Sequence, residues 1–144
     1  MRENPTGSPA GGTARGATNS EDGLRFAIAV ARLAADLKTS DVVVLDLRGL
    51  SALTDFFVIG TGTSDRQARA VLDAIEEHAR SVGRRPFSTT DRAHTSWLLA
   101  DYIDVVVHIF DEEHRAYYDL DGLWGDAPRV DWRTRPPEAV TTDA

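Results

Sequence analysis

The sequence predicts an α/β domain built on one mixed β-sheet of about five strands, with helices on one face. Three observations carry this prediction. Residues 24–38 and 64–82 repeat apolar side chains at helical spacing. Short segments rich in β-branched and aromatic residues lie between and after them. The resulting order is αββαβββα, and it contains no internal repeat, which favours a single mixed sheet.

The 144 residues divide into one folded domain and two tails. Residues 1–20 are rich in Gly, Pro, Ser and Thr and hold no large apolar residue after Met1, which predicts a disordered tail. Residues 134–144 have a similar composition and predict a flexible C-terminal tail. The domain is therefore expected over residues 21–133, which is long enough for one compact core.

The first half of the domain predicts a helix followed by two antiparallel strands. Asn19 or Ser20 is the expected N-cap, and the helical pattern continues to about Lys38. Residues 42–47 form a β-branched run typical of a buried strand, and residues 55–61 form the next strand. The connection between them is short, which favours antiparallel pairing.

The second helix has clear start and stop signals. Ser64 and Gln67 match a capping box, and Gly83 matches a C-terminal cap. The apolar face consists of Ala68, Val71, Leu72, Ile75, Ala79 and Val82. A short edge segment at 85–87 and a polar loop at 88–96 follow the helix.

Two strands at residues 97–102 and 105–110 form a hairpin around Ile103 and Asp104. The alternation of a strand then divides the hairpin into two faces. The face expected under the helices consists of Leu98, Ala100, Tyr102, Val105, Val107 and Ile109. The other face consists of Trp97, Leu99, Asp101, Val106, His108 and Phe110. This mixed composition is expected on a face left open for a partner, although an ordinary half-solvated sheet face fits it equally well.

The last predicted helix of the domain is acidic. A helix is expected from Glu112 to Leu120, ended by Gly122, with Leu123 and Trp124 packing back. Residues 111–122 hold five acids and one arginine, together with two adjacent tyrosines. Acids suit a helix N-terminus, but tyrosines among acids also favour binding to a basic protein.

Composition excludes several classes of function. The absence of cysteine excludes disulfides and thiolate metal sites, and the four histidines show no zinc-ligand spacing. No segment predicts a membrane span or a signal peptide, so a cytoplasmic protein is expected. The net charge of −7 makes free nucleic acid a poor partner. It matches a basic protein surface, although solubility alone explains the charge equally well.

The loop from Gly60 to Ser64, GTGTS, is the remaining candidate for chemistry. A strand, a glycine-containing loop and a helix start can cradle a phosphate. The loop lacks the third glycine of a dinucleotide fingerprint and the lysine of a Walker motif, and Asp65 would repel an anion. A structural turn is favoured, and a nucleotidyltransferase-like, nucleotide-binding enzyme that uses this loop is the alternative. No residue pattern indicates a nucleophile, so neither an enzyme nor a cofactor is expected.

Two stretches of the chain resemble the ribosomal silencing factor family, also called RsfS or Iojap. They are TDFFVIGTGTSDRQ at residues 54–67 and WLLADYIDVVVHIFDEEHRAYYDLDGLWGD at residues 97–126. The resemblance covers about Leu24 to Asp126. It implies a nucleotidyltransferase-like α/β domain without catalytic residues. Two departures from the family pattern are Ile103, where many members have glycine, and Thr90-Asp91, where many have Glu-Gly; Ile103 is expected to change the turn geometry.

The resemblance also implies a function. Members bind the large ribosomal subunit through ribosomal protein uL14, block association with the small subunit and repress translation under nutrient limitation. A homodimer is expected off the ribosome, and neither a membrane nor free nucleic acid is expected as a partner. The predicted contact surface has an apolar centre of Trp97, Leu99, His108 and Phe110. Its predicted acidic and hydrogen-bonding rim is Asp101, Asp104, Glu113, Tyr117 and Tyr118.

Overall fold

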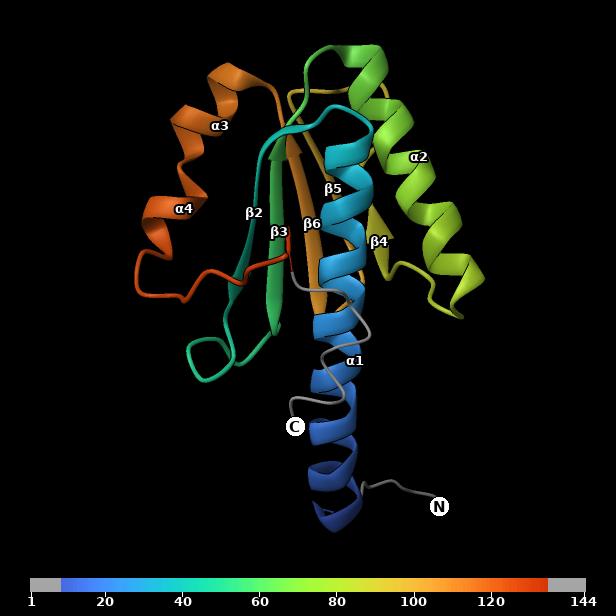
Figure 1. Ribbon diagram of the computed structural model, residues 1–144, viewed down its shortest axis with the longest axis vertical. Coiled ribbons are helices and arrows are strands. Elements are labelled where there is room, and N and C mark those ends of the chain that lie inside the picture. The colour runs from blue at the N-terminus through green and yellow to red at the C-terminus, as the bar shows by residue number, and fades with distance from the viewer. Residues whose placement is uncertain (1–8, 135–144) are drawn as a thin grey trace.

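The computed structural model describes residues 9–134 of the chain, with side chains from Ser20 onward. The described part is one α/β domain whose element order agrees with the predicted αββαβββα, followed by one further short helix (Figure 1). The elements are α1 (Pro9–Asp36), β2 (Ser40–Asp46), β3 (Phe56–Thr61), α2 (Asp65–Ser81), β4 (Ser88–Thr89), β5 (Trp97–Asp101), β6 (Val105–Phe110), α3 (Glu112–Tyr118) and α4 (Leu120–Leu123).

The sheet has five strands in the order β2-β3-β6-β5-β4. Strands β3 and β6 run parallel, and the other three neighbouring pairs are antiparallel. The parallel pair requires a crossover, and α2 with the β4–β5 segment supplies it. The predicted mixed sheet of about five strands is therefore confirmed.

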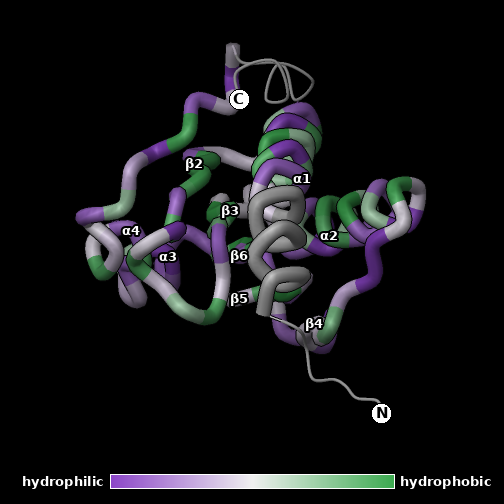
Figure 2. The backbone as a smooth tube through the Cα atoms, turned by 90° about the horizontal axis from the view of Figure 1, so that it is seen from below, coloured by the Kyte–Doolittle hydropathy of each residue, from purple (hydrophilic) through white to green (hydrophobic). Residues whose placement is uncertain are grey.

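Helices α1 and α2 cover one face of the sheet and enclose the main core (Figure 2). The apolar stripe of α2 is buried as predicted, apart from Val82 at the helix end, whose exposure is 54%. From the sheet, the core takes the hairpin residues that alternation assigned to this face. These are Leu98, Ala100, Tyr102, Val105, Val107 and Ile109.

The short helices α3 and α4 lie on the other side of the sheet (Figures 1 and 2). The prediction of helices on one face therefore holds for α1 and α2 but not for the C-terminal helices. A second, smaller core lies here, formed by Leu45, Leu47, Ile59, Phe110 and Ala127, with Phe57, Trp97, Leu120 and Trp124 packed against it. This face carries enough large apolar area that leaving it in water would be costly.

The predicted start of the first helix was wrong. Helix α1 begins at Pro9 rather than at Asn19 or Ser20. The hydroxyl of Ser20 accepts a hydrogen bond from Arg48 (3.0 Å) instead of capping a helix. Proline suits a helix start because its missing N–H has no partner there. Residues 1–8 and 135–144 of the two expected tails lie outside the described residues.

The capping prediction for α2 is confirmed in its main half. The Ser64 hydroxyl accepts a hydrogen bond from the Gln67 amide (3.0 Å), and Gly83 follows the helix with φ of 81°. The Gln67 side chain does not reach back to Ser64. It accepts from the Thr63 amide (3.0 Å) and donates to the carbonyl of Leu37 (2.8 Å), which joins the start of α2 to the end of α1.

The β5–β6 hairpin has the predicted register. Trp97 lies opposite Phe110, and Leu99 lies opposite His108. Ile103 in the turn has φ of 78°, the left-handed conformation that favours glycine. Isoleucine therefore takes up a backbone conformation that glycine adopts without strain, and the expected change of turn geometry relative to other family members stays a prediction.

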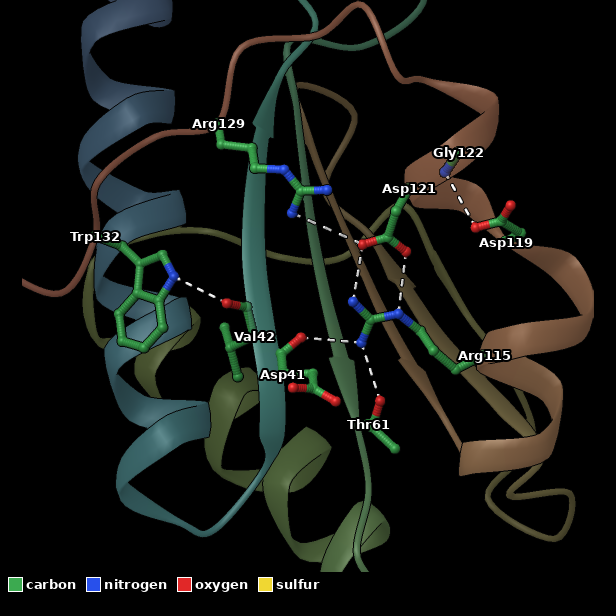
Figure 3. A network of polar contacts seen from close by, with 9 residues as sticks. All are labelled: Asp41, Val42, Thr61, Arg115, Asp119, Asp121, Gly122, Arg129 and Trp132. Carbon is green, nitrogen blue, oxygen red and sulfur yellow. Dashed lines mark hydrogen bonds and ion pairs between the residues drawn. The ribbon is translucent and has the colours of Figure 1, made fainter.

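The segment after α4 protects the outer edge of β2. The Asp46 amide donates to the carbonyl of Pro128 (2.8 Å), and the Val130 amide donates to the carbonyl of Val44 (2.9 Å). Trp132 is buried, and its indole N–H donates to the carbonyl of Val42 (3.1 Å; Figure 3). An uncovered edge strand would offer free backbone groups to another chain, so this segment blocks such pairing at β2.

Candidate protein-binding site

An aromatic cluster occupies the face of the sheet away from α1 and α2. Strands β5 and β6 place Trp97, His108 and Phe110 on this face because their side chains alternate across the sheet. The Trp97 and Phe110 rings stack with centroids 5.0 Å apart, and the Phe57 ring meets His108 edge-on at 4.5 Å. We call Phe57, Trp97, His108, Phe110, Tyr118 and Trp124 the aromatic cluster.

His108 is a buried, neutral member of this cluster. The Trp97 indole N–H donates to Nδ1 of His108 (3.1 Å), so the neutral ring carries its proton on Nε2. Burial lowers the pKa of His108 from 6.5 to about 4. Nε2 has no hydrogen-bond partner among the described residues. The cluster therefore contains one polar group whose hydrogen-bonding capacity is unused.

The predicted open apolar centre is covered in the structure. Phe110 has no exposed surface and His108 is 4% exposed, so neither can contact a partner in this conformation. The Tyr118 ring of α3 packs on Trp97, with centroids 4.6 Å apart, and lies 6.0 Å from Phe110. Alternation placed these residues on the correct face, but it gave no sign that α3 folds back over them. Trp97 and Leu99 remain half-buried at the margin.

The predicted rim residues separate into two groups. Asp104 lies at the hairpin turn, where its carboxylate binds the Arg84 guanidinium (2.8 and 3.1 Å) and joins the turn to the end of α2. Its role here is structural, and it is not part of the α3 side of the molecule. Asp101 is half-buried and accepts a hydrogen bond from the Ile103 amide (2.7 Å), so it supports the turn.

The other predicted rim residues lie together on α3. Asp111 caps this helix by accepting a hydrogen bond from the His114 amide (2.8 Å). No residue of α3 is buried, and Glu113, Tyr117 and Tyr118 are exposed; the exposed fraction of Tyr117 is 78%. We call the exposed side of α3, with Glu112, Glu113, Tyr117 and Tyr118, the α3 surface. It is the accessible part of the predicted contact site.

Arg115 fixes α3 to the sheet and was absent from the predicted contact set. Its guanidinium forms a bidentate pair with Asp121 of α4 (2.9 and 3.1 Å; Figure 3). It also donates to the carbonyl of Asp41 (2.9 Å) and the hydroxyl of Thr61 (2.9 Å). Burial acts to raise the pKa of Asp121, but the Arg115 interaction outweighs it and lowers that pKa. The sequence feature that could have indicated this role is that Arg115 is the one arginine in the acidic segment at residues 111–122.

The helical path is interrupted between α3 and α4 at Asp119. This residue has φ of 49° and accepts a hydrogen bond at its side chain from the Gly122 amide (3.2 Å; Figure 3). The single helix expected from Glu112 to Leu120 is therefore broken into two. The break brings Asp121 back to Arg115, six positions away, which a continuous helix would not allow.

The GTGTS loop borders a cavity of about 410 Å³. Asp41, Asp65, Asp111 and Glu112 line it, and no lysine or arginine does. A triphosphate normally needs a cation or a bound metal ion against its charge. Within residues 9–134, no group of three His, Asp or Glu side chains is placed to hold a metal ion. The cavity thus disfavours a nucleotide.

Among the residues that the structure describes, no helix is long and apolar enough to cross a lipid bilayer.

Comparison with known proteins identifies a family. The model of the family described as "ribosomal silencing factor during starvation" matches residues 20–144. A ribosomal silencing factor of Bacillus subtilis is 38% identical over 96 residues, which cover 67% of this chain and 81% of that protein. The chloroplastic Iojap protein of Zea mays is 39% identical over 111 residues, covering 75% of this chain and 47% of that protein.

Solved structures agree with the fold. A crystal structure from Bacillus halodurans is 34% identical with a TM-score of 0.62, covering 71% of this chain and 92% of that one. A crystal structure from Chromobacterium violaceum is 27% identical with a TM-score of 0.64, covering 74% of this chain and 91% of that one. The arrangement of sheet and helices is therefore similar to those of experimentally determined proteins.

Proposed function

The chain belongs to the ribosomal silencing factor family, and from this premise we propose that it binds the large ribosomal subunit through ribosomal protein uL14. Bound there, it blocks association with the small subunit and represses translation when nutrients are limiting. The observation that carries this proposal is the family match, which spans the domain from residue 20 onward.

The charge of the α3 surface supports a basic protein as the partner. Glu112 and Glu113 are exposed on α3, and the one arginine of this helix is turned inward to Asp121. The chain as a whole has a net charge of −7. Complementary charge raises association rates and selects against acidic surfaces such as free nucleic acid.

The proposed contact residues divide by accessibility. Tyr117, Tyr118 and Glu113 provide an exposed aromatic and acidic centre, and Trp97 and Leu99 extend it along the edge of the sheet. Tyrosine and tryptophan often dominate binding energy when water is excluded around them. His108 and Phe110 support this surface from beneath. Asp101 and Asp104 shape the hairpin rather than form the centre of contact.

Sedimentation of ribosomal subunits tests the proposal. Purified protein is added to dissociated subunits, magnesium is raised, and whole ribosomes are separated from subunits on a sucrose gradient. The expected result is fewer whole ribosomes and this protein in the large-subunit fraction. Normal joining with saturating protein would refute the proposal.

A charge-reversal pair tests the location of the contact. Glu113→Arg is expected to abolish the block, because it places a cation against a basic partner. Asp36→Arg makes the same change in net charge at the end of α1, which covers the opposite face of the sheet. This variant is expected to behave as wild type. Equal effects of the two substitutions would show that net charge, and not the α3 surface, governs binding.

No catalytic step and no cofactor belongs to this function, and the protein acts in the cytoplasm. A homodimer forms off the ribosome, and sedimentation equilibrium of the free protein tests this.

The alternative of a nucleotide-binding enzyme at Gly60–Ser64 is disfavoured by the acidic lining of the adjacent cavity. Titration with ATP and magnesium tests that alternative, and tight binding at this loop would revive it.

A further inference from the structure

We propose that the α3 surface contains a receptor for one arginine side chain of the basic partner. This notch is lined by Glu113, His114, Tyr117 and Tyr118 and has a volume of about 240 Å³. The inference rests on the proposed function for the source of the arginine, but not for the chemistry of the notch itself.

Helical spacing builds the two walls of the notch. Glu113 and Tyr117 are four residues apart, as are His114 and Tyr118, so each pair forms one ridge on the same side of the helix. The His114 and Tyr118 rings stack with centroids 6.2 Å apart. Between the ridges, the Tyr117 and Tyr118 rings meet with centroids 5.0 Å apart and an interplanar angle of 85°. The notch is therefore a corner made by two nearly perpendicular aromatic rings.

Two perpendicular rings fit a flat cation better than a spherical one. A guanidinium that stacks on one tyrosine ring directs its N–H edge toward the face of the other ring. Both contacts use the negative face of an aromatic ring, and arginine is the common partner in such contacts. A lysine ammonium is a compact, strongly hydrated charge and gains from only one of the two geometries.

The charges around the notch select a cation. The Glu113 carboxylate is exposed at its rim, and the Asp111 carboxylate accepts from the His114 ring (2.8 Å) at the start of the same helix. Arg115, the arginine of α3, is 15% exposed and fully engaged by Asp121, Thr61 and Asp41 on the inner side. Arg115 therefore does not compete for the notch. A phosphate or an acidic peptide would be repelled by the same carboxylates.

Tyr118 links the notch to the aromatic cluster. One part of its ring packs on Trp97, and 43% of the residue remains exposed. Because this packing fixes the Tyr118 ring, one wall of the corner is already in place before binding. Preorganisation of this kind reduces the entropy lost when a ligand binds.

A peptide titration tests the notch independently of the ribosome. The full-length protein, labelled with ¹⁵N, is titrated with acetylated, amidated tri-arginine, and in parallel with the same peptide in which citrulline replaces arginine. Citrulline keeps the shape of arginine but lacks the charge. The expected result is saturable amide shifts on α3 with tri-arginine and none with the citrulline peptide. Equal shifts with both peptides would overturn the notch.

Matched variants locate the binding. Tyr117→Leu keeps apolar bulk and favours the helix, and Glu113→Gln removes one charge; each is expected to weaken tri-arginine binding about fivefold, as the loss of one cation–π contact or charge pair predicts. Glu112→Gln removes the same charge one position away, outside the notch lining, and is expected to bind within about twofold of wild type. Unchanged binding by Tyr117→Leu, or an equal loss with Glu112→Gln, would overturn the proposal.

The ribosome assay separates the two proposals. Tyr117→Leu is expected to weaken co-sedimentation with the large subunit by a similar factor. If wild type binds tri-arginine in the notch but does not block subunit joining, the proposed function fails and the notch stands. If wild type blocks joining but does not distinguish arginine from citrulline, the notch fails and the function stands.

Discussion

Ile103 shows how a single residue can carry backbone strain at an exposed turn. Its φ of 78° lies in the left-handed region, which is unfavourable for a β-branched side chain, and its side chain is 59% exposed. Ile103→Gly removes the backbone strain, and it removes few packing contacts because the side chain is largely exposed. We expect it to raise the free energy of unfolding by about 1 kcal/mol, since the relief of strain exceeds the added backbone entropy of glycine. Urea denaturation measures the change.

A glycine of matching conformation provides the control for Ile103. Gly83 has φ of 81° and no atom within 4 Å of the position where a Cβ would stand. Gly83→Ala is therefore expected to lower the free energy of unfolding by about 1 kcal/mol through backbone strain alone. If Ile103→Gly also destabilises the protein, the turn is not strained by isoleucine.

His108 makes the stability of the domain depend on pH. Its pKa is lowered by burial from 6.5 to about 4. Both states are neutral above pH 6.5, so the full stability is present there. As pH falls below 6.5, His108 is protonated in the unfolded chain but stays neutral in the folded chain. The free energy of unfolding therefore decreases until pH reaches about 4. Linkage predicts a loss of about 2 kcal/mol between about pH 7.5 and about pH 5.

The substitution His108→Gln isolates this effect, because glutamine does not titrate. Wild type and variant are unfolded in urea at both pH values, and the change of unfolding free energy with pH is compared. We expect the wild type to lose about 2 kcal/mol more than the variant over this interval. Parallel pH profiles would mean that His108 is not buried in its neutral form.

At the scale of elements, α3 and α4 are held by one polar clamp as well as by packing. Neither helix has a fully buried residue, and Arg115 connects them to β2 and β3 through Asp121, Asp41 and Thr61 (Figure 3). Arg115→Met keeps the length of the side chain but removes the guanidinium that pairs with the partly buried carboxylate of Asp121. We expect a loss of about 2 kcal/mol in the free energy of unfolding, together with faster amide exchange in α3 and α4.

Arg129 supplies the matched control for the clamp. Its guanidinium lies 4.0 Å from Asp121, but its side chain is 57% exposed. Arg129→Met is expected to change stability by less than about 0.5 kcal/mol, because exposed ion pairs contribute little. Equal effects of Arg115→Met and Arg129→Met would mean that the bidentate geometry of Arg115 does not hold the helices.

At the scale of the whole molecule, the two layers of helices differ: one encloses the main core, and the other is largely exposed. Helices α1 and α2 cover one face of the sheet, and the short α3–α4 layer lies on the other face (Figures 1 and 2). The tyrosines and glutamates of α3 are exposed. The α1–α2 side therefore supplies most of the buried core, and the α3–α4 side carries the accessible surface that we propose as the contact site. A contact site on this thin layer would be easier to perturb than the core.

The net charge of −7 predicts salt-sensitive binding to a basic partner. Raising salt from about 50 to about 200 mM shortens the screening length and should weaken large-subunit binding several-fold, mainly by slowing association. Glu113→Gln is expected to reduce this salt dependence. Surface plasmon resonance with immobilised large subunits measures both rates. Binding that is independent of salt would point to an apolar contact instead.

Local sequence signals predicted the elements of this protein. Apolar periodicity gave α2 and its buried stripe, Ser64 and Gly83 gave its ends, and alternation gave both faces of the β5–β6 hairpin. The start of α1 was missed because Ser20, a good capping residue, lies within a helix that begins at Pro9, and its hydroxyl accepts from Arg48 of a distant loop instead of capping. Such a competition between local and distant partners is not visible in a local pattern.

What the sequence determined by itself was the order and type of the elements, the face on which Trp97, His108 and Phe110 lie, and the resemblance to the ribosomal silencing factor family. Only the tertiary structure decided that Tyr118 packs on Trp97 and Phe110, that Arg115 binds Asp121 and that the Tyr117 and Tyr118 rings lie nearly perpendicular to each other. The physical reason is range. Periodicity and caps depend on neighbours within about one helical turn, whereas burial and ion pairing depend on which distant surfaces meet.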